Sequence, residues 1–425
     1  MRIVILAIGS RGDVQPYLAL GVGFRKAGHD VLLAADAEFE ALVRTRDLDF
    51  FPLRTRMRAH MLDARKRKVL VAATRNPFET IWLAWRTKNP DEERRKWEDC
   101  WSASQGAEVI ISSQAAYQGR HIAEKLGVPN MPASYTPFIA PEFLRRYLPR
   151  YLRLGRLAYR PFAIMLGQLI WQSIRTEVNR ARKEILGLPP APFFGSLRRA
   201  YREKIPVLWG FSRFVVPRPA HWPPWFHVTG HWFLDHPPDW QPPPRLVEFL
   251  AAGPPPVSIG FGSTPAEHTE WLTANVLEAL RRSEQRGVLL AGWTGLGKAD
   301  VPDDVLVVDD VPHDWLFPRV AAAVHHGGAG TTAASLRAGV PTVIAPSIAD
   351  HYFWAERVVA LGVGPPYLEL DRLTADQLAA AIRTATTDQG MRDRARALGE
   401  RIRAENGVAC AVEVVEEYAR RVSRQ

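Results

Sequence analysis

Apolar runs alternate with amphipathic stretches along the N-terminal half of the chain. The runs at 2–8, 31–35, 108–112 and 206–210 have the length and composition of buried strands. Between the first two, the pattern predicts a helix over 16–27, with Pro16 near its start and Gly28 just past its end. Strands that alternate with helices form parallel sheets with both faces covered. The N-terminal half is therefore expected to be an α/β domain.

A second alternating series fills the C-terminal half. Its apolar runs lie at 257–261, 288–291, 305–308, 321–325 and 342–345, which predicts a second parallel-sheet domain. Residues 221–256, between the two series, are rich in proline and tryptophan, as an inter-domain linker would be. We expect domains at 1–220 and 257–405 around this linker, and a final helix over 406–425 that packs back on the N-terminal domain.

Composition narrows the class of protein without identifying a function. The chain has 425 residues, 47% apolar and 24% charged, which are the averages of folded globular proteins. Its two cysteines, Cys100 and Cys410, suggest neither a disulfide framework nor a cysteine zinc site. The first apolar run is too short for a signal core, and the stretch 161–174 is shorter than the roughly 20 residues that span a bilayer. We expect a cytoplasmic protein without a transmembrane helix.

The most informative segment is a predicted strand, turn and helix at 321–341. It places His325 at the end of the strand, followed by the glycine-rich turn Gly327-Gly328-Ala329-Gly330-Thr331. Glycines let a diphosphate approach the backbone, and the free N–H groups and positive dipole of a helix start favour an anion. His325 can donate a hydrogen bond to a phosphate oxygen. The segment predicts a nucleotide-diphosphate site, which the net charge of +10 also favours.

This segment resembles the donor signature of the GT-B glycosyltransferases that use nucleotide sugars, and most closely their sterol glucosyltransferase and antibiotic-tailoring branches. Six further motifs resemble the same family in the same order: GDVQP at 12–16, VNR at 178–180, VPRP at 216–219, VTG at 228–230, GFGS at 260–263 and VPHDWL at 311–316. Nearly the whole chain is covered. The resemblance implies two Rossmann-like domains that face each other across a cleft, with the acceptor in the N-terminal domain and the donor in the C-terminal one.

The resemblance also implies a reaction and a set of donor contacts. The reaction is inverting, metal-independent transfer of a hexose from a UDP- or TDP-sugar to a hydroxyl of an apolar acceptor. His325 matches the histidine that contacts phosphate, and Asp350 matches the aspartate that contacts the sugar. His351 stands where glutamine is usual, so we expect it to influence which sugar is accepted. The other positions that match donor-contacting residues are Gly327, Gly328, Ala329, Gly330, Thr331, Ser263, Val311 and His313.

Inverting transfer needs a general base that removes the proton of the acceptor hydroxyl. Asp13 lies in the turn after the first predicted strand. Its loop resembles the one in which plant relatives place a catalytic histidine and the sterol and antibiotic-tailoring branches place a carboxylate. Aspartate is also a preferred helix N-cap, so Asp13 has a structural interpretation too, and the two roles are compatible. Our hypothesis is that Asp13 is the catalytic base.

Residues 141–182 combine many aromatic and aliphatic side chains with arginines. We expect this segment to form the wall of a pocket for a sterol, terpenoid, polyketide or other lipid-like acceptor, with Phe138, Met165 and Leu169 among its contacts. The arginines have two interpretations that the sequence leaves open. They would face acidic headgroups in a peripheral membrane contact, or they would simply lie in water.

Other functions fit the sequence less well. Residues 292–299 have the spacing of a P-loop, but Ala299 stands where a serine or threonine would hold magnesium. The acidic pairs at 303–304 and 309–310 are typical of solvated turns, so we predict no metal and no cofactor. The basic segment 54–68 accompanies no nucleic-acid-binding module, so we expect no nucleic-acid partner. A catalytically silent protein that binds a sugar nucleotide or a lipid on the same fold is the alternative to an enzyme.

Overall fold

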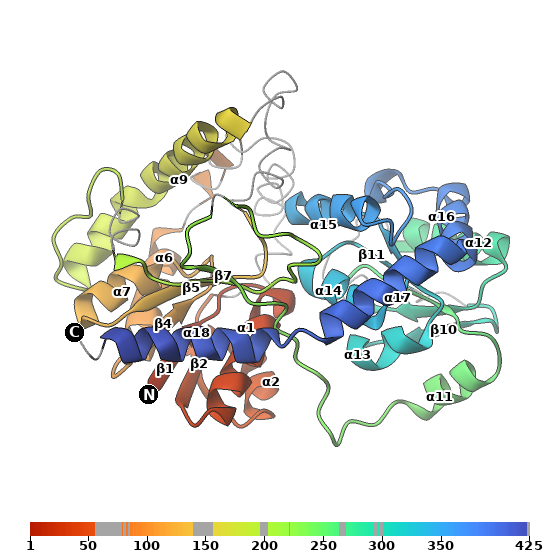
Figure 1. The fold of residues 1–425 in the computed structure, drawn as a ribbon, viewed down its shortest axis with the longest axis horizontal. Helices are drawn as coiled ribbons and strands as arrows, with labels where there is room; N and C mark the ends of the chain where they lie inside the picture. Colours follow the sequence, from red (N-terminus) through yellow and green to blue (C-terminus); the bar gives the residue numbers. More distant parts are fainter. Residues whose placement is uncertain are drawn as a thin grey trace. The chain divides into compact units, whose positions relative to one another are not determined.

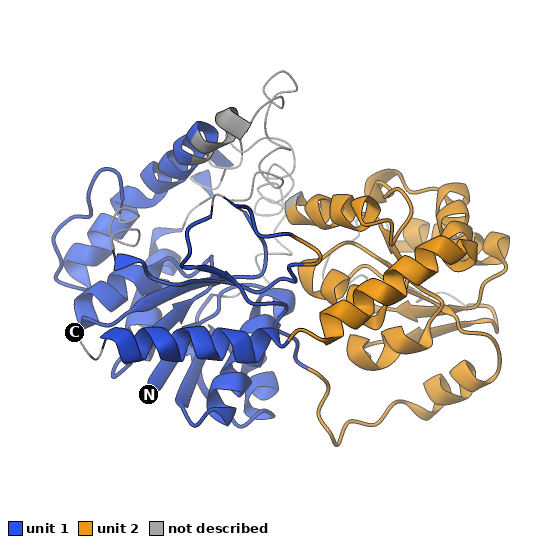
Figure 2. Ribbon diagram, viewed as in Figure 1, with its two compact units in different colours: residues 1–213, 217–234, 406–425 blue, residues 214–216, 235–405 orange. Residues whose placement is uncertain are grey.

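The computed structural model describes residues 1–55, 79, 82–83, 86–87, 89–138, 156–195, 203–220, 222–262, 269–292, 296 and 301–422. The chain forms two compact units (Figures 1 and 2). Unit 1 comprises 1–213, 217–234 and 406–425, and unit 2 comprises 214–216 and 235–405. Each unit is built on one parallel sheet, as the hydrophobic pattern predicts.

The sheet of unit 1 has seven parallel strands in the order β3-β2-β1-β4-β5-β6-β7. In that order they span Asp49–Leu53, Asp30–Asp36, Arg2–Leu6, Val109–Ser112, Asn130–Ser134, Val207–Trp209 and Phe226–Val228. Alternate residues of β1 belong to different cores: Ile3 and Ile5 to one face, Val4 and Leu6 to the other. Both faces are buried, which explains why the central strands are apolar at nearly every position.

Helices cover both faces of this sheet (Figure 1). One face carries α1 (Arg11–Lys26), α2 (Glu40–Arg44) and α18 (Gly407–Val422), with the 3-10 turn η1 (Ala37–Phe39) before α2. The other face carries α6 (Pro90–Ala103), α7 (Gln118–Leu126) and α9 (Arg156–Glu184). Among the described residues, no helix combines the length and apolar character needed to cross a membrane.

The first helix begins earlier than the pattern of prolines predicts. It was expected over 16–27, but α1 begins at Arg11 and contains Pro16 in its interior. A proline at this place removes one backbone hydrogen bond of the helix. The side chain of Asp13 accepts a hydrogen bond from the backbone N–H of Ser10 at 2.5 Å, which stabilises the earlier start.

The expected linker at 221–256 is instead divided between the two units. Its first part contains β7, which completes the sheet of unit 1, and its last part contains α11 (Pro244–Ala251) of unit 2. The aromatic residues are packed rather than exposed, because the ring of Trp222 lies 5.0 Å from that of Trp209 and 5.7 Å from that of Phe226. Tryptophan in this segment therefore marks a small core, and the chain crosses from unit 1 to unit 2 at 234–235, within the segment that was expected to be a linker.

Unit 2 has a five-stranded parallel sheet in the order β10-β9-β8-β11-β12. In that order the strands span Val305–Val308, Gly287–Leu290, Val257–Gly260, Ala322–His325 and Thr342–Ile344. One face packs against α12 (Thr269–Ser283) and α16 (Ala375–Thr387). The other packs against α11, α13 (His313–Leu316) and α14 (Ala329–Ala338). The remaining elements are α15 (Ala349–Ala360), α17 (Gln389–Arg403), η5 (Phe317–Arg319) and η6 (Leu370–Arg372).

The C-terminal helix α18 belongs to unit 1, next to α1 (Figure 2). Its apolar residues Ala411, Val412, Val415 and Tyr418 are part of the core that α1 and the sheet form. At its first residue the helix touches the backbone that precedes unit 2, since a Cβ on Gly407 would lie 2.3 Å from the carbonyl oxygen of His231. Only glycine fits there.

Candidate active site

The two sheets share one strand order. Counted along the chain within each unit, the first five strands lie in the order 3-2-1-4-5. The order reverses between the first and fourth strands, which are β1 and β4 in unit 1 and β8 and β11 in unit 2. Ligands of open α/β sheets bind at the carboxyl edge beside such a reversal. Asp13 follows β1, and the histidine–glycine segment follows β11, so each unit has predicted site residues at this point.

The glycine turn connects β11 to α14. Gly327 has a φ of +92°, and a Cβ there would lie 2.7 Å from Cγ2 of Ile344, so the position requires glycine. Gly328 is the N-cap and α14 begins at Ala329. Gly330 is exposed, with no atom within 4 Å of where its Cβ would be. The first N–H groups of α14 lack hydrogen-bond partners inside the helix. They lie at the edge of the sheet, where the structure around Gly330 is open.

His325 supports this turn from inside the protein. Its side chain is 1% exposed. Its Nδ1 accepts a hydrogen bond from the N–H of Gly327 at 3.0 Å, so the ring proton is on Nε2, which lies 3.3 Å from the hydroxyl of Ser335. Both nitrogens are thus used within unit 2, and the phosphate contact expected of His325 stays a prediction.

The neighbouring His326 is the histidine that the sequence reasoning passed over. Successive residues of a strand point to opposite faces, so the two side chains diverge. The ring of His326 lies between two glycine turns, because a Cβ on Gly262 or on Gly328 would come within 2.6 Å of it. Its Nδ1 is buried and has no hydrogen-bond partner among the described residues. The double histidine was the signal that could have found it.

His351 and Asp350 lie in the first turn of α15, after β12. His351 is 5% exposed, and its ring meets that of His326 edge to face, with 4.6 Å between the centroids. Asp350 is half-buried. The sugar contacts expected of both residues stay predictions, but the burial of His351 leaves it in contact with His326 rather than with the surface.

The histidines of this cluster are neutral. Burial lowers the pKa of His351 to about 3, with His325 adding a smaller effect. Burial, reinforced by the neighbouring histidines, also holds the pKa values of His325 and His326 well below their usual range. An imidazole that stays neutral near pH 7 can donate one hydrogen bond to a phosphate oxygen without the desolvation cost of a buried charge.

The remaining predicted donor contacts have different surroundings. Val311 is buried in the core, so only its backbone is available to a base. His313 begins α13 and stacks on Phe317, with the ring centroids 4.6 Å apart. Ser263 lies outside the described residues, as does most of the P-loop-like stretch 292–299.

In unit 1, Asp13 is held by hydrogen bonds from two sides. Its Oδ2 accepts from the backbone N–H of Ser10 at 2.5 Å and from the Ser10 hydroxyl at 2.8 Å. Its Oδ1 accepts from the hydroxyl of Tyr135, just after β5. Gly9 has a φ of +151°, and a Cβ there would lie 2.3 Å from Cβ of Asp13. Asp13 is the third residue of α1, whose N-cap is Ser10, so the expectation that Asp13 is itself the N-cap was wrong. Its carboxylate instead completes a capping box with Ser10, and it remains partly accessible.

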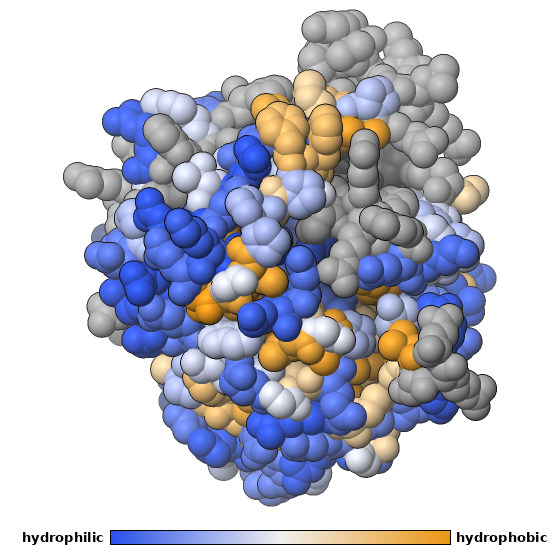
Figure 3. Space-filling model, turned by 90° about the vertical axis from the view of Figure 1, so that its left-hand side faces the viewer, coloured by the Kyte–Doolittle hydropathy of each residue, from blue (hydrophilic) through white to orange (hydrophobic). Residues whose placement is uncertain are grey.

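The predicted acceptor residues also lie in unit 1. Phe138 is half-buried, four residues beyond the end of β5 and therefore on the carboxyl side of that strand. Met165 and Leu169 are exposed on α9, where Ile164 and Ile170 are exposed as well. Apolar side chains gather at the surface among charged ones on the side of the molecule that Figure 3 views. Residues 141–155 of the expected acceptor wall lie outside the described residues.

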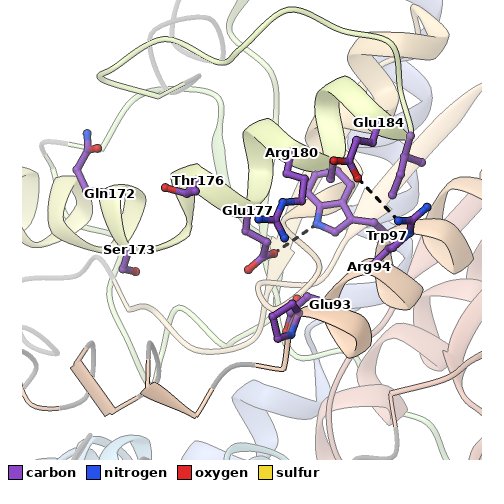
Figure 4. A pocket seen from close by; sticks show the side chains of 12 residues that line it. Glu93, Arg94, Trp97, Gln172, Ser173, Thr176, Glu177, Arg180 and Glu184 are labelled. Atoms are coloured by element: carbon purple, nitrogen blue, oxygen red, sulfur yellow. Dashed lines mark hydrogen bonds and ion pairs between the residues drawn. The ribbon is translucent and has the colours of Figure 1, made fainter.

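A cavity of about 300 Å³ lies between α6 and α9 (Figure 4). Most of its lining residues are of charged or polar types, and the indole N–H of Trp97 points toward Glu177 at 3.4 Å. Phe138, Met165 and Leu169 are not among its lining residues. The cavity therefore does not match the apolar acceptor pocket that the sequence predicts. Within the described part of the chain, no cluster of three or more His, Cys, Asp or Glu side chains could hold a metal ion.

Comparisons with known proteins connect both units to glycosyltransferases. Residues 3–144 match the model of the glycosyltransferase family 28 N-terminal domain. Residues 288–419 match that of the erythromycin biosynthesis protein CIII-like C-terminal domain.

Sterol 3-beta-glucosyltransferases are similar to the chain along its whole length. The one from Cryptococcus neoformans var. neoformans serotype D is 37% identical over 99% of this chain and 28% of its own length. UGT80A2 from Arabidopsis thaliana is 38% identical over 97% of this chain and 64% of its own length. The chain thus spans from about a quarter to two thirds of these relatives.

Solved structures show the same fold. The glycosyltransferase SsfS6 of Streptomyces sp. SF2575, complexed with thymidine diphosphate, has a TM-score of 0.64 at 18% identity and covers 98% of this chain and 99% of its own. The glycotransferase of kitacinnamycin has a TM-score of 0.68 at 20% identity, with coverage of 98% and 99%. The chain therefore has the two-domain GT-B fold and is homologous, along its whole length, to part of the sterol 3-beta-glucosyltransferases.

Proposed function

We propose that this protein transfers a hexosyl group from a nucleoside-diphosphate sugar to a hydroxyl of an apolar acceptor of the sterol class. An identity of 37–38%, over nearly all of this chain but only part of the relatives, to proteins named sterol 3-beta-glucosyltransferases is the observation that carries the proposal. The geometry is consistent with it, since Asp13 follows β1 and the glycine turn follows β11, each at the carboxyl edge of its sheet.

The donor is proposed to bind at the turn between β11 and α14. A diphosphate would accept hydrogen bonds from the first N–H groups of α14, which starts at Ala329. The neutral ring of His326 would add one more donor beside the turn, because it is packed against Gly328. A similar fold bound to thymidine diphosphate is consistent with a donor of this chemical type.

The acceptor hydroxyl is proposed to lose its proton to Asp13. The acceptor oxygen attacks the anomeric carbon, and the new C–O bond forms as the bond from that carbon to the phosphate oxygen breaks. The nucleoside diphosphate leaves with the electron pair of the broken bond, while the proton moves to the carboxylate. Attack from the face opposite the leaving group inverts the anomeric carbon. We propose that no metal and no cofactor take part.

The acceptor body is proposed to bind near α9. The exposed Met165 and Leu169 offer apolar surface on that helix, and Phe138 lies on the carboxyl side of the same sheet as Asp13. An apolar, rigid molecule with a single hydroxyl fits such surroundings, because its body gains from leaving water while its hydroxyl meets the base.

The test is a transfer assay on the purified chain with a panel of UDP- and TDP-sugars and a 3β-hydroxysterol. We expect one glycosylated sterol, with inverted anomeric configuration by NMR and an unchanged rate in the presence of EDTA. The matched control is the same sterol with its hydroxyl acetylated, which should yield no product. Donor binding without transfer to any acceptor would instead identify a silent binding protein, and loss of activity in EDTA would overturn the metal-independent mechanism.

A further inference from the structure

The side chain of Tyr135 joins two strands at the carboxyl edge of unit 1. It follows β5 directly, and its hydroxyl donates a hydrogen bond to Oδ1 of Asp13, which follows β1. The two residues are 122 positions apart in sequence. A helix cap needs no partner of this kind, because Ser10 alone supplies the cap contacts to Oδ2. The contact from Tyr135 therefore calls for another explanation.

The hydrogen bond from Tyr135 occupies one of the acceptor positions of the Asp13 carboxylate. Each carboxylate oxygen accepts about two hydrogen bonds. Oδ2 has two donors, the N–H and the hydroxyl of Ser10. Among the described residues, Oδ1 has one donor, the hydroxyl of Tyr135. One position on Oδ1 is thus left for an incoming hydroxyl, and Tyr135 determines on which side of that oxygen it lies.

We propose that Tyr135 is a positioning residue for the reaction, which orients the carboxylate of Asp13 so that Oδ1 takes the proton of the acceptor. The inference rests on the proposed function, in which Asp13 is the base. Tyr135 acts through Asp13 and does not touch the reacting atoms.

Tyr17 is a second titratable side chain close to Asp13 and Tyr135 in the described part of the structure. It lies on α1, its ring is 6.3 Å from that of Tyr135, and its hydroxyl donates to the carbonyl of Ala133 at 2.7 Å rather than to Asp13. Burial, with the charge of Asp13 as a smaller cause, raises the pKa of Tyr17 far above its usual value. Tyr17 is therefore a neutral neighbour that lacks the contact in question, which makes it a matched control.

The experiment compares Tyr135→Phe with Tyr17→Phe and the unchanged chain. Each variant removes one hydroxyl and keeps the ring. For Tyr135→Phe we expect kcat to fall by about 10-fold, the loss of roughly one hydrogen bond to a charged group. The affinity for UDP or TDP should not change. The KM for the acceptor should also not change, since Tyr135 acts on the base rather than on the bound acceptor.

Tyr17→Phe should lower the melting temperature and leave kcat unchanged. A Tyr135→Phe protein that is folded by circular dichroism, binds the nucleotide normally and keeps the kcat of the unchanged chain would overturn the proposal, because a merely structural tyrosine affects stability rather than kcat. Asp13→Asn is measured in parallel. If it transfers sugar at the normal rate, the base is misassigned and the proposed mechanism fails with the inference. If it is inactive, an unchanged kcat in Tyr135→Phe refutes the inference alone.

Discussion

Units 1 and 2 each have a turn where the strand order of the sheet reverses, after β1 and after β11. The two turns carry different chemical groups. In unit 1 the turn after β1 offers a single carboxylate, Asp13, which side chains and one backbone N–H hold in place. In unit 2 the turn after β11 offers backbone N–H groups, and its histidines are neutral and largely buried. A turn that acts through one side chain should be sensitive to the loss of that side chain, whereas a turn that acts through its backbone should be sensitive to changes in shape.

We expect the largest effect on the transfer rate when the carboxylate of Asp13 is removed. Asp13→Asn should lower the transfer rate by a factor on the order of 10²–10⁴, because the amide cannot accept the proton of the acceptor. Affinity for the nucleotide should stay within about twofold, since the base acts in the transition state. The measurements are steady-state kinetics and nucleotide titration. Asp91→Asn, in the first turn of α6, is the control for losing a helix-start carboxylate. Near-normal transfer by the Asp13 variant would reduce Asp13 to a cap.

The second prediction separates the two adjacent histidines of unit 2. His326→Ala should weaken nucleotide binding by about 10–100-fold, the loss of one hydrogen bond to a charged group. His325→Ala should mainly destabilise the fold, by about 1–3 kcal/mol, because the N–H of Gly327 and the hydroxyl of Ser335 lose a buried partner. Isothermal titration and denaturant unfolding of both variants distinguish these effects. If His325→Ala has the larger effect on affinity at unchanged stability, the phosphate contact belongs to His325.

The third prediction concerns the shape of the glycine turn. Gly327→Ala should destabilise unit 2 by about 1–3 kcal/mol and weaken nucleotide binding, because a Cβ at a φ of +92° is strained and meets Ile344. Gly330→Ala, three residues on, is the matched control, since it adds a methyl group into open space within a helix. Thermal unfolding with and without nucleotide measures both. Equal behaviour of the two variants would mean that shape is not what the turn requires.

The smallest expected effect is on the pH dependence of stability. His351 has a folded pKa of about 3, against about 6.5 for an unfolded histidine. Between these values the unfolded state binds the extra proton, so stability is full above about pH 6.5 and falls as the pH is lowered. His351→Gln should therefore reduce the slope of unfolding free energy against pH by up to about 1.4 kcal/mol per pH unit. Denaturant unfolding at pH 6.5, 5.5 and 4.5 tests this, and identical slopes would contradict it.

Much of the fold was predictable, because strands that are buried on both faces leave continuous apolar runs. The strands β1, β2, β4, β6 and all five strands of unit 2 were found in this way. The strands β3, β5 and β7 were missed. Two of them contain a proline, Pro52 and Pro132, and the third lies among the tryptophans and prolines that suggested a linker. In these strands, packing against the neighbours outweighs local propensity.

The site was predictable by position but less so by orientation. Both turns were located from their sequences, since glycine and aspartate mark such turns directly. The choice between His325 and His326 depends on which face of β11 each side chain takes, and a shift by one residue exchanges the faces. The contact between Tyr135 and Asp13 joins residues far apart in the chain, so no local sequence pattern predicts it.

The C-terminal helix has a consequence for the order in which the protein is completed during synthesis. Unit 2 ends at Glu405, whereas unit 1 is finished only when α18 adds Val412, Val415 and Tyr418 to its core. A ribosome makes the N-terminal strands first, but the apolar surface of α1 that α18 covers must wait for the last helix to emerge. Unit 2 can therefore complete its core before unit 1 does. Until α18 is made, unit 1 keeps apolar surface exposed and depends on molecular chaperones to protect it.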